Sequence, residues 1–156
     1  MIQANNLEKY PTRQKAMAII EAGLIAIDTK KVVQSSISLE REILKIKDLQ
    51  VDLREFGGVK VIGFGKASSE AAVELEKILG EKITDGAIID INTGGCQRIK
   101  EFIGTHPHPS PQNVSAAKQL LAIAEEADEK DLVLVIVSGG GSALLCWPEE
   151  ECKQGE

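Results

Sequence analysis

The chain has 156 residues, 43% of them hydrophobic and 27% charged, which suffices for one domain with a hydrophobic core and argues against extensive disorder. Its formal net charge is −6 and it contains no block of Lys or Arg, so a nucleic-acid groove or an anionic membrane surface is a poor candidate for a partner. No apolar run reaches the length of a membrane span, and the N-terminus lacks the apolar core of a signal peptide.

The first third of the chain carries one clear helical pattern. Apolar residues spaced three and four apart predict an amphipathic helix from Thr12 to about Thr29, and Pro11 suits its first turn. A polar link follows at residues 35–36. Residues 43–49 predict a short strand or extended segment, and the glycine pair at 57–58 marks a turn.

The remainder alternates strands and helices. In chain order we expect a strand at 59–64, a helix at 67–79 stopped by Gly80, strands at 87–91 and 99–104, a helix from Pro111 to about Ala127 capped by Ser110, and a strand at 132–137. The last strand is a β-branched apolar run, which is typical of burial on both faces. The pattern predicts an α/β fold: a three-layer sandwich around a mostly parallel, doubly wound (Rossmann-like) sheet.

The first of two glycine loops, VIGFGKASS, follows the strand at 59–64. In parallel sheets, ligands bind beyond the carboxyl ends of the strands. Gly63 and Gly65 allow a sharp turn or a close approach of the backbone to a ligand. Lys66 places a cation at a helix N-terminus, where free N–H groups attract anions, and Ser68 adds a hydroxyl. Neither a Walker loop nor GxGxxG is matched, and a tight structural turn with a surface lysine is the alternative.

The second glycine loop ends the last strand. Its residues are Ser138, Gly139, Gly140, Gly141 and Ser142. Successive glycine amides flanked by two hydroxyls form an anion-binding nest, so we expect a phosphate or carboxylate there. A flexible hinge is the alternative, and a serine nucleophile is disfavoured because GxSxG is not matched.

The segment THPHPSP holds the chain's two histidines, and its prolines exclude a helix. His106 and His108 stand two apart on a stiff loop and rarely could face one ion, so we expect no metal site. His106 either presents its ring to a ligand or belongs to a plain structural turn. Asp85 and Asp90 are expected in solvated turn and strand-end roles rather than as magnesium ligands.

The three cysteines form no Cys-x-x-Cys pair and are odd in number. Cys96, Cys146 and Cys152 are therefore read as buried or tail thiols rather than metal ligands or disulfides. This usage suits a reducing compartment, and we expect a cytoplasmic protein.

Three motifs in this order, VIGFGKAS, GTHPHPSPQNVSAAKQLL and DLVLVIVSGGGSALL, resemble the N-terminal domain of the glycerate 2-kinase family, whose members have often been labelled hydroxypyruvate reductase. The resemblance runs from about Thr12 to Pro148. It divides the chain into an α/β domain at 1–148 and an acidic tail at 149–156. The chain is then expected to be truncated, with a C-terminal domain absent that would complete the site.

The resemblance implies ATP- and Mg²⁺-dependent phosphorylation of the 2-hydroxyl of D-glycerate, giving 2-phosphoglycerate, in a cleft between two domains. It implies that Lys66 is a catalytic residue, that 138–142 lines the cleft and that His106 matches a family histidine. Ser110 stands where many members carry Asp, which puts an acidic role there in doubt. Lys66 could grip either phosphate or the glycerate carboxylate, and the fragment alone is expected to be inactive.

Three other functions remain open from the sequence. A hydroxypyruvate reductase would need a nicotinamide site, but no GxGxxG with a downstream acidic residue is present. A phosphosugar-binding isomerase-type domain uses a similar strand–GxGKS–helix turn, although the HPHP segment and the triple glycine depart from it. A non-catalytic ligand-binding domain is the third alternative.

Overall fold

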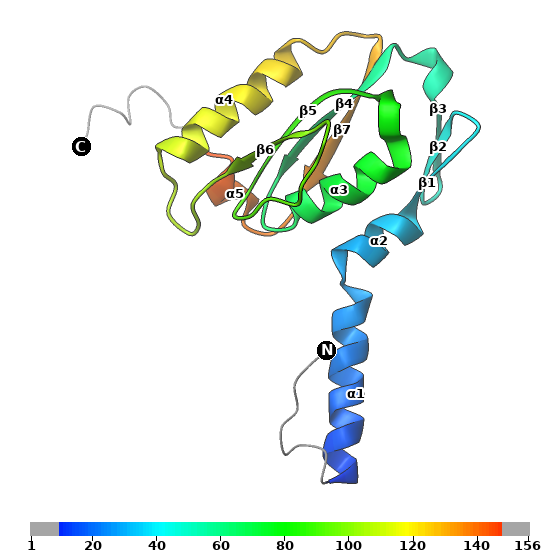
Figure 1. The fold of residues 1–156 in the computed structure, drawn as a ribbon, viewed down its shortest axis with the longest axis vertical. Coiled ribbons are helices and arrows are strands. Elements are labelled where there is room, and N and C mark those ends of the chain that lie inside the picture. Colours follow the sequence, from blue (N-terminus) through cyan, green and yellow to red (C-terminus); the bar gives the residue numbers. More distant parts are fainter. Residues whose placement is uncertain (1–9, 148–156) are drawn as a thin grey trace.

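The computed structural model describes residues 10–147, and its centre is a parallel β-sheet (Figure 1). Four strands form this sheet: β4 (Gly58–Phe64), β5 (Ile83–Asp90), β6 (Lys100–Ile103) and β7 (Asp131–Val137). They lie in the order β6-β5-β4-β7, and every neighbouring pair is parallel. The predicted α/β class is confirmed, and the carboxyl ends of all these strands lie at one end of the sheet.

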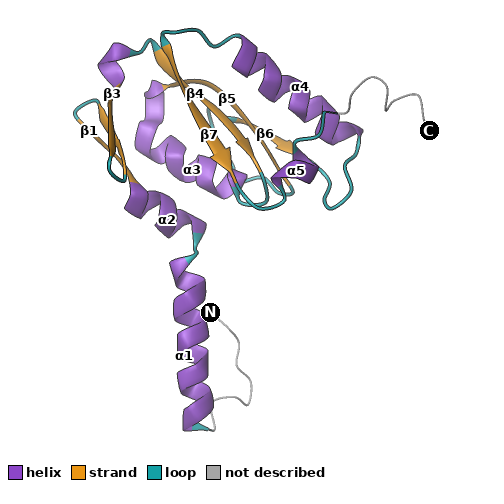
Figure 2. Ribbon diagram, turned by 180° about the vertical axis from the view of Figure 1, so that it is seen from behind, coloured by secondary structure: helices purple, strands orange, loops and turns teal. Residues whose placement is uncertain are grey.

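Two helices cover the two faces of the sheet (Figure 2). The helix α3 (Ser68–Leu79) packs against one face and α4 (Pro111–Glu125) against the other. Successive side chains of a strand point to opposite faces, so Val61 of β4 lies in the α3-side core and Ile62 in the α4-side core. Gly80, at a φ of 52°, ends α3 as predicted and opens a 3₁₀ helix that runs to Lys82.

A small antiparallel sheet precedes the parallel one, where the sequence predicted only one short strand. Its strands are β1 (Ile37–Glu40), β2 (Ile43–Ile46) and β3 (Leu49–Asp52), followed by a 3₁₀ helix at Leu53–Glu55. Arg41 and Glu42 form the first two-residue turn with φ of 49° and 73°, and Lys47 in the second has φ of 52°. Such turns usually carry Asn-Gly or Asp-Gly, so these hairpins gave no sequence signal.

The N-terminal region contains two helices rather than one. The first, α1 (Pro11–Ala26), projects away from the sheet (Figure 1), and none of its residues is buried. Its predicted apolar face is therefore exposed. The predicted link at 35–36 is instead the end of α2 (Thr29–Ser36), whose N-cap Asp28 accepts a hydrogen bond from the Lys31 amide at 3.0 Å. Within residues 10–147, none of the helices has the length and apolar character needed to cross a bilayer.

Strand β7 differs from its predicted environment. It pairs only with β4 and forms an edge of the described sheet. Val135 and Val137 are 57% and 67% exposed, so the expectation of a strand buried on both faces is wrong for the described residues. The apolar run reports β-propensity correctly, but it does not reveal how many neighbours the strand has.

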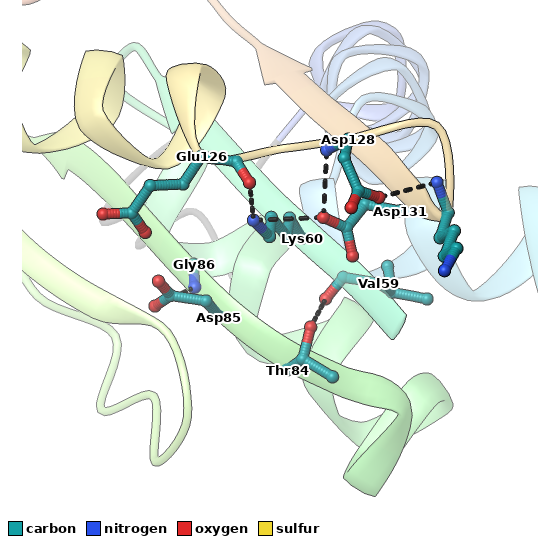
Figure 3. Close-up of polar contacts among 9 residues, drawn as sticks. Val59, Lys60, Thr84, Asp85, Gly86, Glu126, Asp128 and Asp131 are labelled. Atoms are coloured by element: carbon teal, nitrogen blue, oxygen red, sulfur yellow. Dashed lines mark hydrogen bonds and ion pairs between the residues drawn. The ribbon is translucent and has the colours of Figure 1, made fainter. Parts of the chain in front are cut away.

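At the amino ends of the strands, polar groups pair with one another (Figure 3). The Lys60 ammonium lies 3.1 Å from the Asp131 carboxylate and donates to the Glu126 carbonyl at 2.9 Å. The same carboxylate accepts from the Asp128 amide at 3.3 Å. These contacts tie the starts of β4 and β7 to the end of α4.

Candidate functional site

The two glycine loops interlock at the carboxyl ends of β4 and β7. The Ser138 amide donates to the Phe64 carbonyl at 3.0 Å, and the Lys66 amide donates to the Gly139 carbonyl at 2.9 Å. Gly65 has a φ of 117°, and a Cβ there would overlap Ser138. The glycine is therefore required for the close approach of the loops.

The backbone donors of the first loop are occupied within the chain. The Gly65 amide donates to the Ile89 carbonyl at 3.2 Å, and the Ala67 amide to the Ser138 hydroxyl at 3.0 Å. The Ser69 amide, in the first turn of α3, donates to the Asp90 carboxylate at 2.9 Å. The expectation of free amides at this helix start is therefore wrong for Ser68 and Ser69, because the Gly65 carbonyl and a side chain of the neighbouring strand already accept from them.

Two predicted site residues in this loop face the interior. The Ser68 hydroxyl is fully buried and donates to the Gly65 and Ile89 carbonyls at 2.8 and 2.9 Å. Gly63 lies within β4, where a Cβ would meet the side chains of Ile88 and Ile136. In the described structure both residues therefore have a structural role in packing and hydrogen bonding beneath the turn.

The second loop leaves its amides open. The amides of Gly139, Gly140, Gly141 and Ser142 donate to no acceptor within residues 10–147. The loop continues into the short helix α5 (Gly141–Leu144). The first hydrogen bonds of this helix run from the Ala143 and Leu144 amides to the Gly140 carbonyl. Consecutive free N–H groups are the arrangement that binds an anion.

Lys66, His106 and Gly140 converge at this end of the sheet. A Cβ built on Gly140 would lie 3.0 Å from Nε2 and Cδ2 of His106 and 3.2 Å from Cε of Lys66. Gly140 has a φ of 83°, which favours glycine, and only a residue without a side chain leaves room for both neighbours. The Lys66 ammonium is exposed and has no partner among the described residues. The structure thus brings together three residues that the sequence singled out in separate motifs.

The His106 loop follows β6 and precedes α4. The His106–Pro107 peptide bond is cis, and both histidines are exposed. Ser110 is the N-cap of α4 and shares a capping box with Asn113. Sequence reasoning identified this cap but missed that Asn113 is fully buried and bonds to the histidine loop.

A polar cavity of about 490 Å³ opens beside Lys66, between α3 and the end of β5. Asp90 lines it and is only 2% exposed, while Asn92 and Thr93 are exposed on its wall. The other lysines on the cavity, Lys30 and Lys77, pair with glutamates. A separate groove of about 320 Å³ on the α4 face is lined entirely by apolar atoms and lacks the groups to bind a phosphate.

Two carboxylates hold the segment at 94–99, which starts at the cavity wall with Gly94. Glu101 accepts from the amides of Gly94, Gly95 and Cys96 at 2.6, 2.8 and 2.9 Å. Glu76 of α3 accepts hydrogen bonds from the next three amides, those of Gln97, Arg98 and Ile99.

These carboxylates also set the local acidities. Burial opposes ionisation of Glu101, but its hydrogen bonds from Ser69 and the loop amides outweigh burial and lower its pKa. Burial, together with the charges of Glu101 and Glu76, raises the pKa of the Cys96 thiol to about 12. Cys96 and Cys146 are free thiols, and Cys152 lies outside the described residues.

The described residues offer no ready-made metal centre. Between residues 10 and 147 there is no group of three or more His, Cys, Asp or Glu side chains able to hold an ion. Mg²⁺ in phosphoryl-transfer enzymes is commonly held by one or two carboxylates together with substrate phosphates. Asp90 is the buried carboxylate nearest to that description, and its two oxygens already accept from the Ser69 and Ile91 amides.

Comparison with known proteins identifies relatives along nearly the whole chain. A family model described as a domain of unknown function, DUF4147, matches residues 15–155. A glycerate 2-kinase of Pyrococcus horikoshii is 31% identical over 140 residues, which cover 88% of this chain and 31% of that protein. A glycerate 2-kinase of Picrophilus torridus is 30% identical over 149 residues, covering 94% of this chain and 34% of its own length.

A solved structure shares the fold. The crystal structure of the PH0495 protein of Pyrococcus horikoshii superposes with a TM-score of 0.78 at 30% identity, covering 96% of this chain and 33% of that one. The chain therefore spans about a third of the length of the relatives it matches.

Proposed function

The chain belongs to the glycerate kinase family, of which it forms the N-terminal domain, and on this premise we propose that it supplies one wall of the active site of a longer kinase. That kinase transfers the terminal phosphoryl group of ATP to the 2-hydroxyl of D-glycerate and releases 2-phosphoglycerate. The opposing wall comes from a C-terminal domain, in keeping with relatives about three times as long.

The observation that carries the proposal is the convergence of Lys66, His106 and Gly140 beside a row of free amides. Phosphoryl transfer requires positioning and neutralisation of spread negative charge more than covalent chemistry by the protein. The amides of residues 139–142 can donate hydrogen bonds to phosphate oxygens, and the unpaired Lys66 ammonium can neutralise the charge of the phosphoryl group during transfer. His106 lies close enough to Gly140 to contact a phosphate held on that turn.

The cavity beside Lys66 suits the acceptor. A short hydroxy acid carries one carboxylate and neutral hydroxyls, and the cavity offers one unpaired cation and several hydrogen-bonding groups. We assign the glycerate to this side of Lys66 and the nucleotide phosphates to the triple-glycine side. Four residues hold the two loops at the spacing that this division needs, namely the buried Gly63, Gly65 and Ser68 and the half-buried Ser138.

ATP and Mg²⁺ are the expected cosubstrate and ion, and the cytoplasm is the expected compartment. Mg²⁺ bound to ATP neutralises phosphate charge. The described residues hold no group of three potential ligands, so the proposal gives this domain no complete ion site and no step that depends on one.

The test is an assay of the full-length protein with ATP and D-glycerate, coupled so that 2-phosphoglycerate is detected and the 3-isomer is not. We expect ATP-dependent formation of the 2-isomer. Oxidation of NADH with hydroxypyruvate, without ATP consumption, would overturn the kinase in favour of a reductase.

The 156-residue chain alone is expected to show no turnover, because it contributes only one side of the site. Robust activity of the isolated chain would contradict the two-domain arrangement while leaving the chemistry intact.

A further inference from the structure

We propose that Asn113 is a positioning residue that locks the His106 loop against the triple-glycine turn, so that the imidazole, Lys66 and Gly140 stay in register. The catalytic consequence rests on the proposed kinase function. The connection between the two loops follows from the hydrogen bonds of one fully buried side-chain amide, that of Asn113.

The carbonyl end of this amide gathers donors from the histidine loop. Its Oδ1 accepts from the Thr105 amide at 2.9 Å and from the Thr105 hydroxyl at 3.1 Å. It also accepts from the Ser110 amide and hydroxyl at 3.2 and 2.8 Å. Thr105 directly precedes His106, so these bonds fix the backbone from which the imidazole projects.

The amino end of the amide reaches the other loop. Its Nδ2 donates to the Thr105 carbonyl at 3.0 Å and to the carbonyls of Ala143 and Leu144 at 3.0 and 3.3 Å. Ala143 and Leu144 belong to α5, and their own amides donate to the Gly140 carbonyl. One side chain thus connects the residue before His106 with the helical turn that begins at Gly140.

The amide orientation is set by its partners. Backbone N–H groups can only donate and carbonyls can only accept, so Oδ1 must face Thr105 and Ser110, and Nδ2 must face α5. Capping α4 alone would need only an acceptor, which Asp supplies equally well. The donor half, with three acceptors outside α4, is therefore the part that capping does not explain.

The space around the Asn113 side chain is also restricted. A Cβ on Gly104 would lie 3.0 Å from Asn113 Nδ2 and 2.9 Å from a Leu144 methyl. Loss of the donated bonds would leave three carbonyls without this donor and free α5 to shift relative to the histidine loop. Displacement of a positioning element by about 1 Å can cost as much as ~100-fold in rate.

The experiment compares Asn113→Asp with Gln112→Ala in the full-length protein. Asp keeps the size and the acceptor oxygens but removes the donors to α5, whereas Gln112 is an exposed neighbour in the same helical turn. We expect Asn113→Asp to lower kcat by about 10- to 100-fold with the KM for D-glycerate changed by less than about threefold. Gln112→Ala is expected to match the wild type in both parameters.

A second readout does not depend on turnover. NMR of the His106 imidazole, assigned by loss of its signal in His106→Gln, should show a shifted or broadened resonance in Asn113→Asp and no change in Gln112→Ala. If the wild type lacks kinase activity, the proposed function fails, but this spectrum still decides whether Asn113 positions the ring.

A third variant covers the case in which Asn113→Asp does not fold. Thr105→Val removes the hydroxyl bonds to Asn113 and to the His108 carbonyl while leaving the donors to α5 in place. It is expected to perturb the His106 resonance in the same direction with a smaller fall in kcat. An unchanged His106 resonance in every folded variant, or a kcat within twofold of the wild type for Asn113→Asp, would overturn the proposal.

Discussion

Two lysines on the same strand–turn unit mark opposite ends of the sheet and have opposite environments. Lys60, near the amino ends, is 13% exposed and lies 3.1 Å from a carboxylate that is itself 18% exposed. Lys66, at the carboxyl ends, is exposed and has no partner among residues 10–147. One ammonium is neutralised within the fold, and the other has no counter-charge among the described residues.

The backbone repeats this contrast. At the amino ends, side chains and carbonyls satisfy one another (Figure 3). At the carboxyl ends, the amides of 139–142 have no acceptor in the described part of the chain. Local satisfaction is the rule in folded proteins, so an end of a sheet that departs from it is where function is expected.

The largest expected effect comes from removing the unpaired cation. In the full-length protein, Lys66→Ala should lower kcat by about 100-fold or more, the range for loss of one group that stabilises transition-state charge. The midpoint of thermal unfolding should barely move, because the residue is exposed and its ammonium makes no hydrogen bond or ion pair within the described fold. Kinetic assay and thermal denaturation measure the two effects.

Lys77→Ala is the matched control. Lys77 lines the same cavity but pairs with Glu74 at 2.6 Å. An equal loss of activity in both variants, or a large fall in the unfolding midpoint for Lys66→Ala, would contradict the contrast drawn between the two ends of the sheet.

The next largest effect is expected where the glycine turn approaches the His106 ring. Gly140→Ala adds a Cβ 3.0 Å from the His106 ring at a φ of 83°, so we expect both lower activity and a loss of about 1 kcal/mol of stability. At Gly139 a Cβ meets nothing within 4 Å, and Gly139→Ala should destabilise less. Chemical denaturation of the pair measures the difference, and equal destabilisation would contradict the crowding at Gly140.

A smaller effect is expected at the amino ends. Lys60→Met removes the partner of a half-buried carboxylate and should lower the unfolding midpoint by a few degrees without changing kcat. Lys130→Met, at an exposed lysine in the adjoining turn, should leave the midpoint unchanged. A fall in kcat for Lys60→Met at unchanged stability would place function at the wrong end of the sheet.

The same pair predicts a pH dependence with a definite sign. Hydrogen bonding from Lys60 and from the Asp128 amide lowers the pKa of Asp131 below its ordinary value of 3.8. The associated stabilisation is therefore complete above that value and is lost as the pH falls through the lowered pKa. The stability difference between wild type and Lys60→Met should shrink over that acidic interval, as followed by thermal unfolding.

The last prediction concerns the chemical reactivity of the Cys96 thiol, which lies near the cavity, and not the activity of the protein. A pKa of about 12 leaves roughly a thousandfold less thiolate at pH 8 than the ordinary value of 9.0, so alkylation should be correspondingly slow. A Cys146→Ser, Cys152→Ser variant isolates this thiol for measurement with iodoacetamide. Rapid labelling of the folded variant would show that Glu101 and Glu76 do not surround it as described.

The predictable parts of the molecule were those with strong local patterns. The apolar runs and helical spacings identified β4, α3, β5, β6, α4 and β7 in their correct order. Left-handed turns at Arg41 and Lys47 lack the usual glycine, so the small sheet was not foreseen. The edge position of β7 depends on which strands lie beside it, and no pattern within the run contains that information.

The site was predictable only in its separate pieces. Lys66, His106 and the triple glycine each stood out in sequence, but their convergence at Gly140 depends on the order of strands in the sheet. The Ser69 amide at the start of α3 is occupied by Asp90, a residue 21 positions away in sequence. The Ser110-x-x-Asn113 spacing resembles a capping box, yet the donor half of Asn113 bonds 30 residues away, at Ala143.

The carboxylates of Glu101 and Glu76 determine which backbone amides at this end of the sheet remain available to an external anion. They already occupy the amides of residues 94–99, as ligands tethered to the same chain. A tethered ligand acts at a high effective concentration, so a free phosphate competes poorly for these donors. The chain thereby saturates one run of amides with its own side chains and leaves the run from Gly139 to Ser142 open.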